Sequence, residues 1–493
     1  MHSLRKKDPY SNRYTHCSKT GLHRRKRAAL LRLLPKNKHK GKNMKKKEHC
    51  QMIIILLKIL LVSLITTAFG YLWFEFYTDK LYISYYNLGN WAIILLYGIL
   101  YLFLCRIYSA FRVGYYSITE LIYTHGITLF LTNTLTYIVI CLLTRHLTNI
   151  LWILLLFAIQ VLCAALWAYA SNRIFFKANP RCDMLVVYKD ETAKMLLTKM
   201  KAYPEKYHVA ETINIQSEIQ DIKEKIKAYP SVLLCDLPTA TRNILLKFCV
   251  QEKIRVYLTP EVSDILISGA NRIHLFDTPL LLCDNASQAV THRFAKRLID
   301  LIVSIVMIIV FSPFMLLTII AIKASDHGKI LYKQERLTQN SKTFNVYKFR
   351  SMVEDAEKDG VARLSSKNDD RITPVGKFIR ATRLDELPQL FNIFKGDMTL
   401  VGPRPERPEI TEKYCKTMPE FALRLQVKAG LTGYAQIFGK YNTTPKDKLK
   451  LDLMYIADNS LFLDFKILFL TFKTMFMKES TEGIEDGAVT AEE

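Results

Sequence analysis

Two acidic residues stand next to each other in the densest group of charged side chains in the sequence. Asp385 and Glu386 follow Arg380 and Arg383, and Arg404 comes soon after them between two prolines. Adjacent carboxylates can divide into a nucleophile and a ligand for Mg²⁺, and guanidinium groups bind phosphate with paired hydrogen bonds. The group therefore predicts chemistry on a phosphorylated substrate. Residue types alone leave open a second interpretation, a helix cap with surface ion pairs.

The residues around the carboxylates predict a short helix that would position them. Asp385 is a candidate N-cap, Pro388 falls in the first turn, where its missing N–H is tolerated, and Gly396 stands where a helix would end. The apolar side chains that recur at helical spacing are Leu387, Leu390, Phe391 and Phe394. Both carboxylates would then lie at a helix N-terminus, whose partial positive charge favours carboxylate and phosphate groups.

Four apolar runs precede this segment and predict membrane-spanning helices. They are Met52–Phe74, Trp91–Cys105, Ile127–Leu143 and Ile150–Ala170, each near the roughly 20 residues that cross a bilayer. Basic residues precede the first run and follow the second and the fourth, which places these ends in the cytoplasm. The aromatic cluster between Tyr71 and Tyr86 suits the opposite interface.

A fifth apolar run, Leu301–Ile322, has Ser312 and Pro313 at its middle and basic residues on both sides. By the charge rule both of its ends belong in the cytoplasm, which a straight crossing does not allow. Proline removes one backbone donor and clashes with the preceding helical turn. We therefore predict a re-entrant hairpin broken at Pro313, with a kinked crossing as the alternative.

Between the fourth and fifth runs, the chain alternates short apolar runs with helical stretches. The apolar runs are Met184–Tyr188, His208–Ile215, Ser231–Cys235, Ile254–Leu258 and Leu280–Cys283. This alternation predicts a parallel, Rossmann-like α/β sheet. A dinucleotide site would need glycines directly after the first strand, and residues 188–194 contain none. We therefore expect a structural, regulatory or oligomerising role for this segment.

The net charge of +24 is concentrated near the start of the chain, because the first 49 residues hold 17 Lys and Arg and only two acids. We expect a disordered arm that obeys the positive-inside rule. Nucleic-acid binding is not expected, since no helix-turn-helix or aromatic and basic sheet pattern is present. The ten cysteines form no CxxC pair and suit small buried positions. The acidic end from Glu479 is predicted to be disordered.

Seven segments carry a resemblance to a known family. In chain order they are Lys296–Asp300, Ser312–Pro313, Lys348–Met352, Arg383–Leu390, Gly396–Pro405, Gly430–Gln436 and Tyr455–Asp464. Together they closely resemble the bacterial sugar transferase family, the polyprenyl-phosphate glycosyl-1-phosphate transferases, also called monotopic phosphoglycosyl transferases. The preceding spans and the Rossmann-like segment resemble the long form of this family, which initiates exopolysaccharide, capsule or O-antigen repeat units.

The resemblance implies a reaction in which a UDP-sugar gives its hexose-1-phosphate to undecaprenyl phosphate and releases UMP. It implies that Asp385 forms an aspartyl phosphosugar and that Glu386 holds Mg²⁺, with Asp464 as a further candidate ligand. The candidates for contact with phosphate or substrate are Arg350, Arg380, Arg383, Gln389 and Arg404. Lys296 and Arg297, at the entrance of the hairpin, are candidates for contact with the lipid phosphate, or alternatively anchors at the interface.

The expected fold is that of a membrane protein with a four-helix transmembrane bundle, a Rossmann-like α/β domain, and a re-entrant helix with a mixed α/β catalytic domain on the cytoplasmic face. The expected boundaries are 1–50 for the arm, 51–175 for the bundle, 180–290 for the Rossmann-like domain, 292–478 for the re-entrant helix and catalytic domain, and 479–493 for the tail. We expect the bacterial inner membrane as its location, membrane lipid as a partner and a homodimer as one option for its assembly.

Three alternative functions stay open at this point. The first is a non-catalytic membrane scaffold or ligand sensor. The second is direct transfer in a ternary complex, with Asp385 as a base. The third is polyisoprenyl-phosphate N-acetylhexosamine transfer by a multi-pass enzyme of a different fold. The sequence does not identify the sugar, because that choice depends on a few pocket contacts. UDP-glucose or UDP-galactose is the expectation from the long form of the family.

Overall fold

The computed structural model describes residues 38–82, 87–179, 183–189, 192–201, 207–283, 290–326, 328–353, 371–439 and 443–475. Most of the predicted basic arm and the whole acidic tail lie outside the described residues. We refer to residues 38–179 as the N-terminal helices, to residues 183–282 as the α/β region, and to residues 290–475 as the C-terminal region.

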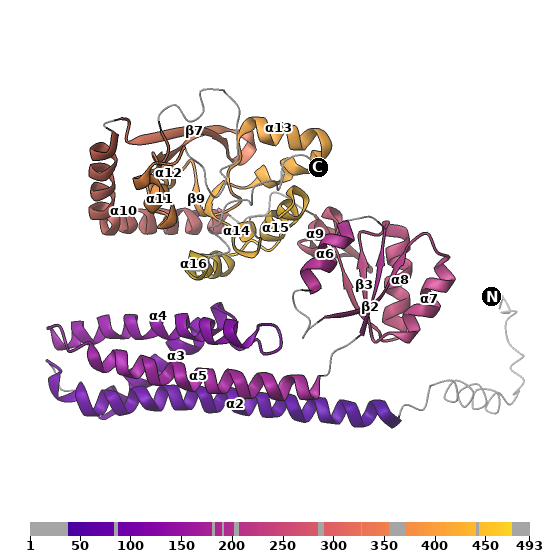
Figure 1. The fold of residues 1–493 in the computed structure, drawn as a ribbon, viewed down its shortest axis with the longest axis horizontal. Helices are drawn as coiled ribbons and strands as arrows, with labels where there is room; N and C mark the ends of the chain where they lie inside the picture. The colour runs from indigo at the N-terminus through magenta and orange to yellow at the C-terminus, as the bar shows by residue number, and fades with distance from the viewer. Residues whose placement is uncertain are drawn as a thin grey trace, which may run out of the picture.

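The N-terminal helices are α2 (Lys38–Phe76), α3 (Asn87–Ile107), α4 (Ile118–Thr144) and α5 (Leu151–Ala178), with a 3-10 helix, η1 (Thr78–Lys80), after α2. They lie side by side around a shared apolar core (Figure 1). All four are long and apolar enough to cross a membrane, as predicted. Helix α4 begins at Ile118 rather than at the predicted Ile127, because Ser117 and Glu120 form a capping box that starts the helix earlier.

A closed polar ring fixes three of these helices against one another. The Tyr97 hydroxyl donates to Asn133 Oδ1 at 2.8 Å, Asn133 donates to Gln160 Oε1 at 3.0 Å, and Gln160 donates to the Tyr97 oxygen at 2.8 Å. All three side chains are buried. Because a polar group in hydrocarbon has no water to bond, such a ring favours one register of α3, α4 and α5.

The α/β region contains a parallel sheet, as predicted. Its elements are β1 (Asp183–Tyr188), α6 (Thr192–Lys201), β2 (His208–Asn214), α7 (Ile219–Ala228), β3 (Ser231–Cys235), α8 (Thr239–Gln251), β4 (Arg255–Leu258) and α9 (Val262–Ser268). The strand order is β2-β1-β3-β4, and all pairs are parallel. Helices α7 and α8 cover one face of the sheet and α6 covers the other (Figure 1).

The fifth strand expected in this sheet is placed elsewhere. Residues Leu280–Cys283 fall largely in β6 (Thr278–Leu282), which pairs with β5 (Asn271–Leu275) in a separate antiparallel hairpin. Only Phe276 and Asp277 connect the two strands. A parallel pair needs a crossover of a dozen or more residues, so this short connection permits only a hairpin.

Helix α10 (Val290–Asp326) contains Pro313 and is the fifth helix of membrane-spanning length and composition in the described residues. Figure 1 shows it as two arms that meet at a sharp bend, with the second arm leading to β7. Many apolar side chains on both arms are exposed, including Ile309, Val310 and Leu317. The bend agrees with the predicted break in the helix. The return of the chain to its original side of the membrane stays a prediction.

The C-terminal region begins, after α10, with the antiparallel hairpin of β7 (Leu331–Leu337) and β8 (Thr343–Phe349), joined through η2 (Gln339–Ser341). Then follow α11 (Pro374–Ala381), η3 (Leu384–Glu386), α12 (Gln389–Lys395), β9 (Thr399–Val401), α13 (Pro408–Thr417), η4 (Pro419–Gln426), β10 (Gly430–Thr432), α14 (Tyr434–Phe438), α15 (Pro445–Ala457) and α16 (Leu461–Met475). Strands β9 and β10 are parallel. A core of side chains from α10, β8, α12, β9, α15 and α16 holds these elements together.

Helix α16 joins the C-terminal region to the N-terminal helices. Its Leu470 packs with Leu104 and Tyr108. The Tyr108 hydroxyl donates to the Phe469 carbonyl at 2.9 Å, and Lys473 Nζ donates to the Thr124 hydroxyl at 2.9 Å. These contacts lie where α3 ends and α4 begins, at the end of the helices that the charge pattern predicts to be cytoplasmic.

Candidate active site

The two adjacent carboxylates lie in η3, a single 3-10 turn between α11 and α12. Arg383, just before the turn, has a left-handed backbone conformation with φ 59°. Leu384 and Leu387, on either side of the carboxylates, pack against α10 and β8. The prediction that Asp385 caps the following helix is therefore wrong: α12 begins at Gln389, with Pro388 as its N-cap. The left-handed residue turns the chain sharply after α11, so the carboxylates fall in a tight turn that is fixed by two partly buried leucines.

Glu386 lies among three cationic side chains from three elements. Its Oε1 is 3.3 Å from Arg404 Nη2, 3.7 Å from Lys348 Nζ and 3.8 Å from Arg383 Nη1. Burial by itself would raise the pKa of Glu386, but these cations outweigh it and lower the pKa to about 2. Glu386 is therefore ionised at any physiological pH.

Asp385 has the opposite electrostatic situation, although it is the neighbouring residue. Burial and the charge of Glu386 raise the pKa of Asp385 to about 6, against the opposing effect of Lys348, Arg383 and Arg380. Its side chain is only 9% exposed, and its Oδ1 is buried without a hydrogen-bond partner among the described residues. An ionised Asp385 would therefore present a poorly solvated oxygen, which is the state of an activated nucleophile or base.

Five residues were predicted to contact phosphate or substrate, and they lie in different surroundings. Arg383, Arg404 and Arg380 all act electrostatically on the carboxylate pair, and their contact with phosphate stays a prediction. Gln389 is buried in the first turn of α12, directly after the turn. Arg350 is buried at the end of β8, and its guanidinium lies against Gly328.

The residues predicted for the lipid phosphate and for a second metal ligand form contacts of their own. Lys296 Nζ donates to the Val401 carbonyl at 3.0 Å and forms an ion pair with Asp464. The Tyr455 hydroxyl donates to Asp464 Oδ1 at 2.7 Å. Arg297 donates to the carbonyl groups of α12 at Ile393 and Phe394. Lys296 and Asp464 thus bind each other, and Arg297 caps a helix; their proposed roles toward lipid and metal stay predictions.

One important member of the site, Lys348, was not among the predicted site residues. It follows Phe344 and Val346 at alternate positions of β8, and Val346 belongs to the core. Alternation along a strand predicts that Lys348 points to the same, inward side. A lysine at an inward strand position two residues before Arg350 was the signal that could have identified it. Its ammonium group is buried enough to lower its pKa.

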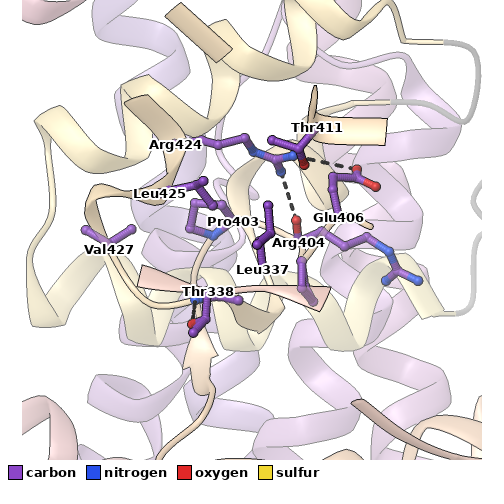
Figure 2. A pocket seen from close by; sticks show the side chains of 11 residues that line it. Leu337, Thr338, Pro403, Arg404, Glu406, Thr411, Arg424, Leu425 and Val427 are labelled. Carbon is purple, nitrogen blue, oxygen red and sulfur yellow. Dashed lines mark hydrogen bonds and ion pairs between the residues drawn. The ribbon is translucent and has the colours of Figure 1, made fainter. Parts of the chain in front are cut away.

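A pocket lies behind the loop that presents Arg404. Its lining includes Leu337, Thr338, Pro403 and Arg424. Figure 2 shows that the Arg404 carbonyl faces Arg424, while the Arg404 side chain extends away from it. The side of this loop away from Glu386 is therefore anchored by a second, deeply buried arginine.

The C-terminal region is similar to known proteins. Residues 291–478 match the family described as Bacterial sugar transferase. The chain is 36% identical over 223 residues, 45% of its own length and 52% of the relative, to a UDP-N-acetylgalactosamine-undecaprenyl-phosphate N-acetylgalactosaminephosphotransferase of Aeromonas hydrophila. It is 40% identical over 207 residues, 41% of its length and 43% of the relative, to a UDP-glucose:undecaprenyl-phosphate glucose-1-phosphate transferase of Klebsiella pneumoniae.

A third relative is an undecaprenyl-phosphate galactose phosphotransferase of Salmonella typhimurium, 38% identical over 203 residues, which are 38% of this chain and 42% of that protein. The chain thus spans about half the length of the curated relatives that it matches. The three relatives differ in the sugar that their names give.

Proposed function

Because residues 291–478 of this chain form a domain of the bacterial sugar transferase family, we propose that the protein transfers a sugar-1-phosphate from a nucleoside-diphosphate sugar to undecaprenyl phosphate. The observation that carries this proposal is the pair of adjacent carboxylates with opposite pKa shifts, surrounded by cations. Two anionic substrates must meet here, and cationic side chains reduce their repulsion.

The proposed donor is a UDP-sugar, and the reaction takes two steps. Asp385 attacks the sugar-bearing phosphorus, a new P–O bond forms to its carboxylate, and the bond to the UMP phosphate breaks. An oxygen of undecaprenyl phosphate then attacks the same phosphorus and releases Asp385, which leaves a lipid-diphosphate sugar. Arg404 and Arg383, whose side chains are each 37% exposed, would contact the donor phosphates.

Mg²⁺ is the proposed metal, with Glu386 as its ligand. This cation takes one or two carboxylates and completes its shell with water and phosphate oxygens. Among the described residues, no cluster of three or more His, Cys, Asp or Glu side chains could hold a metal ion. The adjacent carboxylates and the unpartnered Oδ1 of Asp385 nevertheless fit the sparse donor set that Mg²⁺ uses. When bound, Mg²⁺ would neutralise charge that develops on the phosphoryl oxygens.

One observation also favours a second mechanism, direct transfer with Asp385 as a general base. A carboxylate whose pKa is about 6 suits a base that works near neutral pH. In that mechanism Asp385 accepts a proton from the lipid phosphate, which attacks the donor directly. The two mechanisms differ in one product, because only nucleophilic attack links the sugar phosphate to the protein.

The proposed location is the bacterial inner membrane, with the C-terminal region in the cytoplasm, where nucleotide sugars are made. The protein is a multi-pass membrane protein by the length and composition of its helices. Arg293 and Lys296 begin α10, Lys323 lies in its last turn, and Lys329 follows it. Because both ends are basic, we propose that the bend at Pro313 makes α10 re-entrant. A homodimer and a role in exopolysaccharide, capsule or O-antigen synthesis stay part of this proposal.

The reaction is tested by nucleotide release. The full chain in lipid nanodiscs is mixed with undecaprenyl phosphate, Mg²⁺ and each of UDP-glucose, UDP-galactose and UDP-N-acetylgalactosamine. We expect UMP release with one of these donors, together with a lipid-linked sugar diphosphate. Glu386→Gln should lose most of the activity, because it removes the ionised ligand. Absence of UMP and lipid product with all donors would contradict the proposed reaction.

A further inference from the structure

Helix α15 holds the loop that presents Arg404, and it does so from one face. Lys448, Asp452 and Tyr455 recur at four and three residues, a spacing that places them along one side of the helix. Each of them contacts either this loop, which we define as residues 401–406, or the arginine that supports it. None of the three belongs to the carboxylate site itself.

Three points of loop 401–406 are anchored in this way. At its start, the Tyr455 hydroxyl oxygen lies 3.0 Å from the Val401 carbonyl oxygen, and Lys296 Nζ donates to both oxygens at 3.0 Å. At its centre, Arg424 Nη2 donates to the Arg404 carbonyl at 2.9 Å (Figure 2), and the same nitrogen lies 2.7 Å from Asp452 Oδ2. At its end, Lys448 Nζ forms a short hydrogen bond with Glu406 Oε1. The position of Arg404 therefore depends on the position of α15.

The central anchor is deeply buried. The side chains of Arg424 and Asp452 are 2% and 1% exposed, and Arg424 Nη1 also lies 3.6 Å from Glu406 Oε1. Removing one partner of a buried ion pair leaves an uncompensated charge, which is strongly destabilising. The Arg404 carbonyl is thus held by Arg424, and Arg424 is held in turn by Asp452 of α15.

The neighbouring side of α15 packs against the α/β region. Leu449 and Leu453 form an apolar cluster with Ile265 of α9 and Phe421 of η4. Helix α9 is fixed in turn to α8, because Nη1 and Nη2 of Arg242 donate to the two carboxylate oxygens of Asp264 at 2.6 and 2.7 Å. The two regions thus share one helix, with the α/β region on one side of it and loop 401–406 on the other.

The two helices also approach each other closely at one point. Gly269 ends α9, and a Cβ placed on it would lie 2.8 Å from Ala457 Cβ and 2.9 Å from Ala457 Cα. Gly269 has φ −85°, which any residue can adopt. Glycine is therefore needed here for space and not for backbone conformation, and the close contact depends on the absence of a side chain.

We propose that the α/β region positions Arg404 for phosphate transfer through α15, with Ile265, Gly269, Asp452 and Arg424 as positioning residues. The contacts form one continuous path from α8 to Arg404, which lies 3.3 Å from Glu386. This inference rests on the proposed function only in the experiments that measure activity. It assigns a mechanical role to a region that has no glycine-rich nucleotide loop.

The test uses Gly269→Ala in the full chain in nanodiscs, with Gly126→Ala as the matched control. A Cβ on Gly126 of α4 would meet nothing within 4 Å. We expect Gly269→Ala to lower kcat/KM by about tenfold, since displacements near 1 Å can cost about 100-fold. The loss should lie in kcat more than in KM, because a displaced Arg404 would stabilise the developing phosphoryl charge less. Gly126→Ala should keep the wild-type kcat and KM.

Hydrogen exchange supplies a readout that does not require activity. The Gly402 amide donates to the Thr432 carbonyl at 2.9 Å, and we expect it to exchange faster in Gly269→Ala but not in Gly126→Ala. If Gly269→Ala fails to fold, a double variant with Leu449→Ala and Leu453→Ala loosens the same contact without a clash. Its rate and its exchange at Gly402 are then measured in the same way.

Two results would overturn the inference: a folded Gly269→Ala with wild-type exchange at Gly402, or an unchanged kcat in that variant. A wild-type protein without transfer activity would instead contradict the proposed function, and the exchange experiment would still decide the present inference.

Discussion

Asp385 and Glu386 are neighbours in the chain but have opposite electrostatic environments. Glu386 Oε1 lies within 4 Å of three cations from β8, η3 and the loop after β9. Asp385 is buried beside that ionised neighbour, and its Oδ1 has no hydrogen-bond partner in the described part of the chain. One carboxylate is therefore held as a permanent anion, and the other can change its protonation near neutral pH. This difference supports the assignment of two different roles.

The pH dependence of the reaction should follow Asp385. Because the proposed nucleophile must be ionised, we expect kcat/KM to fall as the pH decreases through about 6. Lys348 lowers the pKa of Asp385, so Lys348→Met should raise that pKa. The fall of kcat/KM on the acid side of the pH profile, the acid limb, should then move to higher pH. The measurement is the rate of UMP release between pH 5 and 9 for both proteins. A Lys348→Met limb at the same or lower pH would contradict the electrostatic assignment.

Asp385 should decrease the stability of the folded protein at pH values where it is ionised. Its pKa is raised from 3.8 to about 6 in the folded protein, so folding favours the protonated form and stability declines as the pH rises between these values. Above pH 6 the loss amounts to about 3 kcal/mol at most. We therefore expect Asp385→Asn to be inactive but to melt at a higher temperature at pH 8. That advantage should shrink toward pH 4, and thermal unfolding scans across this range would measure it.

Residue types and spacing predicted that Asp385, Glu386, Arg383 and Arg404 act together, and the structure places Arg383 and Arg404 within 4 Å of Glu386. They were not sufficient for Lys348, because its role depends on the pairing of β7 with β8 and on the side of the hairpin that faces η3. Nor did spacing reveal that Lys296 and Asp464 bind each other, since they stand far apart in the chain and meet only when α10 packs on α16. Contacts between distant elements are set by packing, which local pattern does not contain.

At the scale of elements, the clearest prediction concerns α10. Proline inside an apolar helix predicted a break, and the two arms meet at a bend (Figure 1). If α10 is re-entrant, single cysteines introduced at Arg293 and at Lys329 in a cysteine-depleted chain should both react with a membrane-impermeant maleimide from the cytoplasmic side. A cysteine at Tyr82, after α2, serves as the control for the opposite side. Opposite accessibility of the first two positions would show a crossing instead.

Element boundaries were harder to predict than element types. The helical repeat after Asp385 suggested one continuous apolar stripe, but only Leu390 is buried, whereas Phe391 and Phe394 are 43% and 46% exposed. The helix begins at Gln389, because the left-handed Arg383 and the 3-10 turn precede it. Its end at Gly396, with φ 98°, was predicted correctly, since glycine adopts the left-handed conformation without strain.

At the scale of the whole molecule, the α/β region and the N-terminal helices both contact the C-terminal region. Helix α16 packs on the ends of α3 and α4, and α15 packs on α9. Composition and apolar runs were enough to predict these three parts of the chain. The contacts between them were not predictable, because they use single residues such as Tyr108, Ile265 and Gly269 that no periodic pattern marks.

This organisation predicts that the α16 contact affects assembly rather than chemistry. Tyr108→Phe removes the hydrogen bond to the Phe469 carbonyl but keeps the ring. We expect a loss of about 1 kcal/mol in stability, with the acid limb of the rate profile unchanged. The comparison with Lys348→Met, which should shift that limb, separates a structural contact from an electrostatic one. A shift of the limb in Tyr108→Phe would mean that this contact also reaches the carboxylates.

The most direct test of the account is to look for the sugar phosphate on Asp385. The full chain is incubated with Mg²⁺ and a UDP-sugar that is radioactive at the phosphate next to the sugar, without lipid, and the denatured protein is examined for label. We predict label on the wild type, none on Asp385→Asn, and release of the label when undecaprenyl phosphate is added. Lipid-dependent release of UMP without any label on the protein would contradict the covalent mechanism and would favour direct transfer.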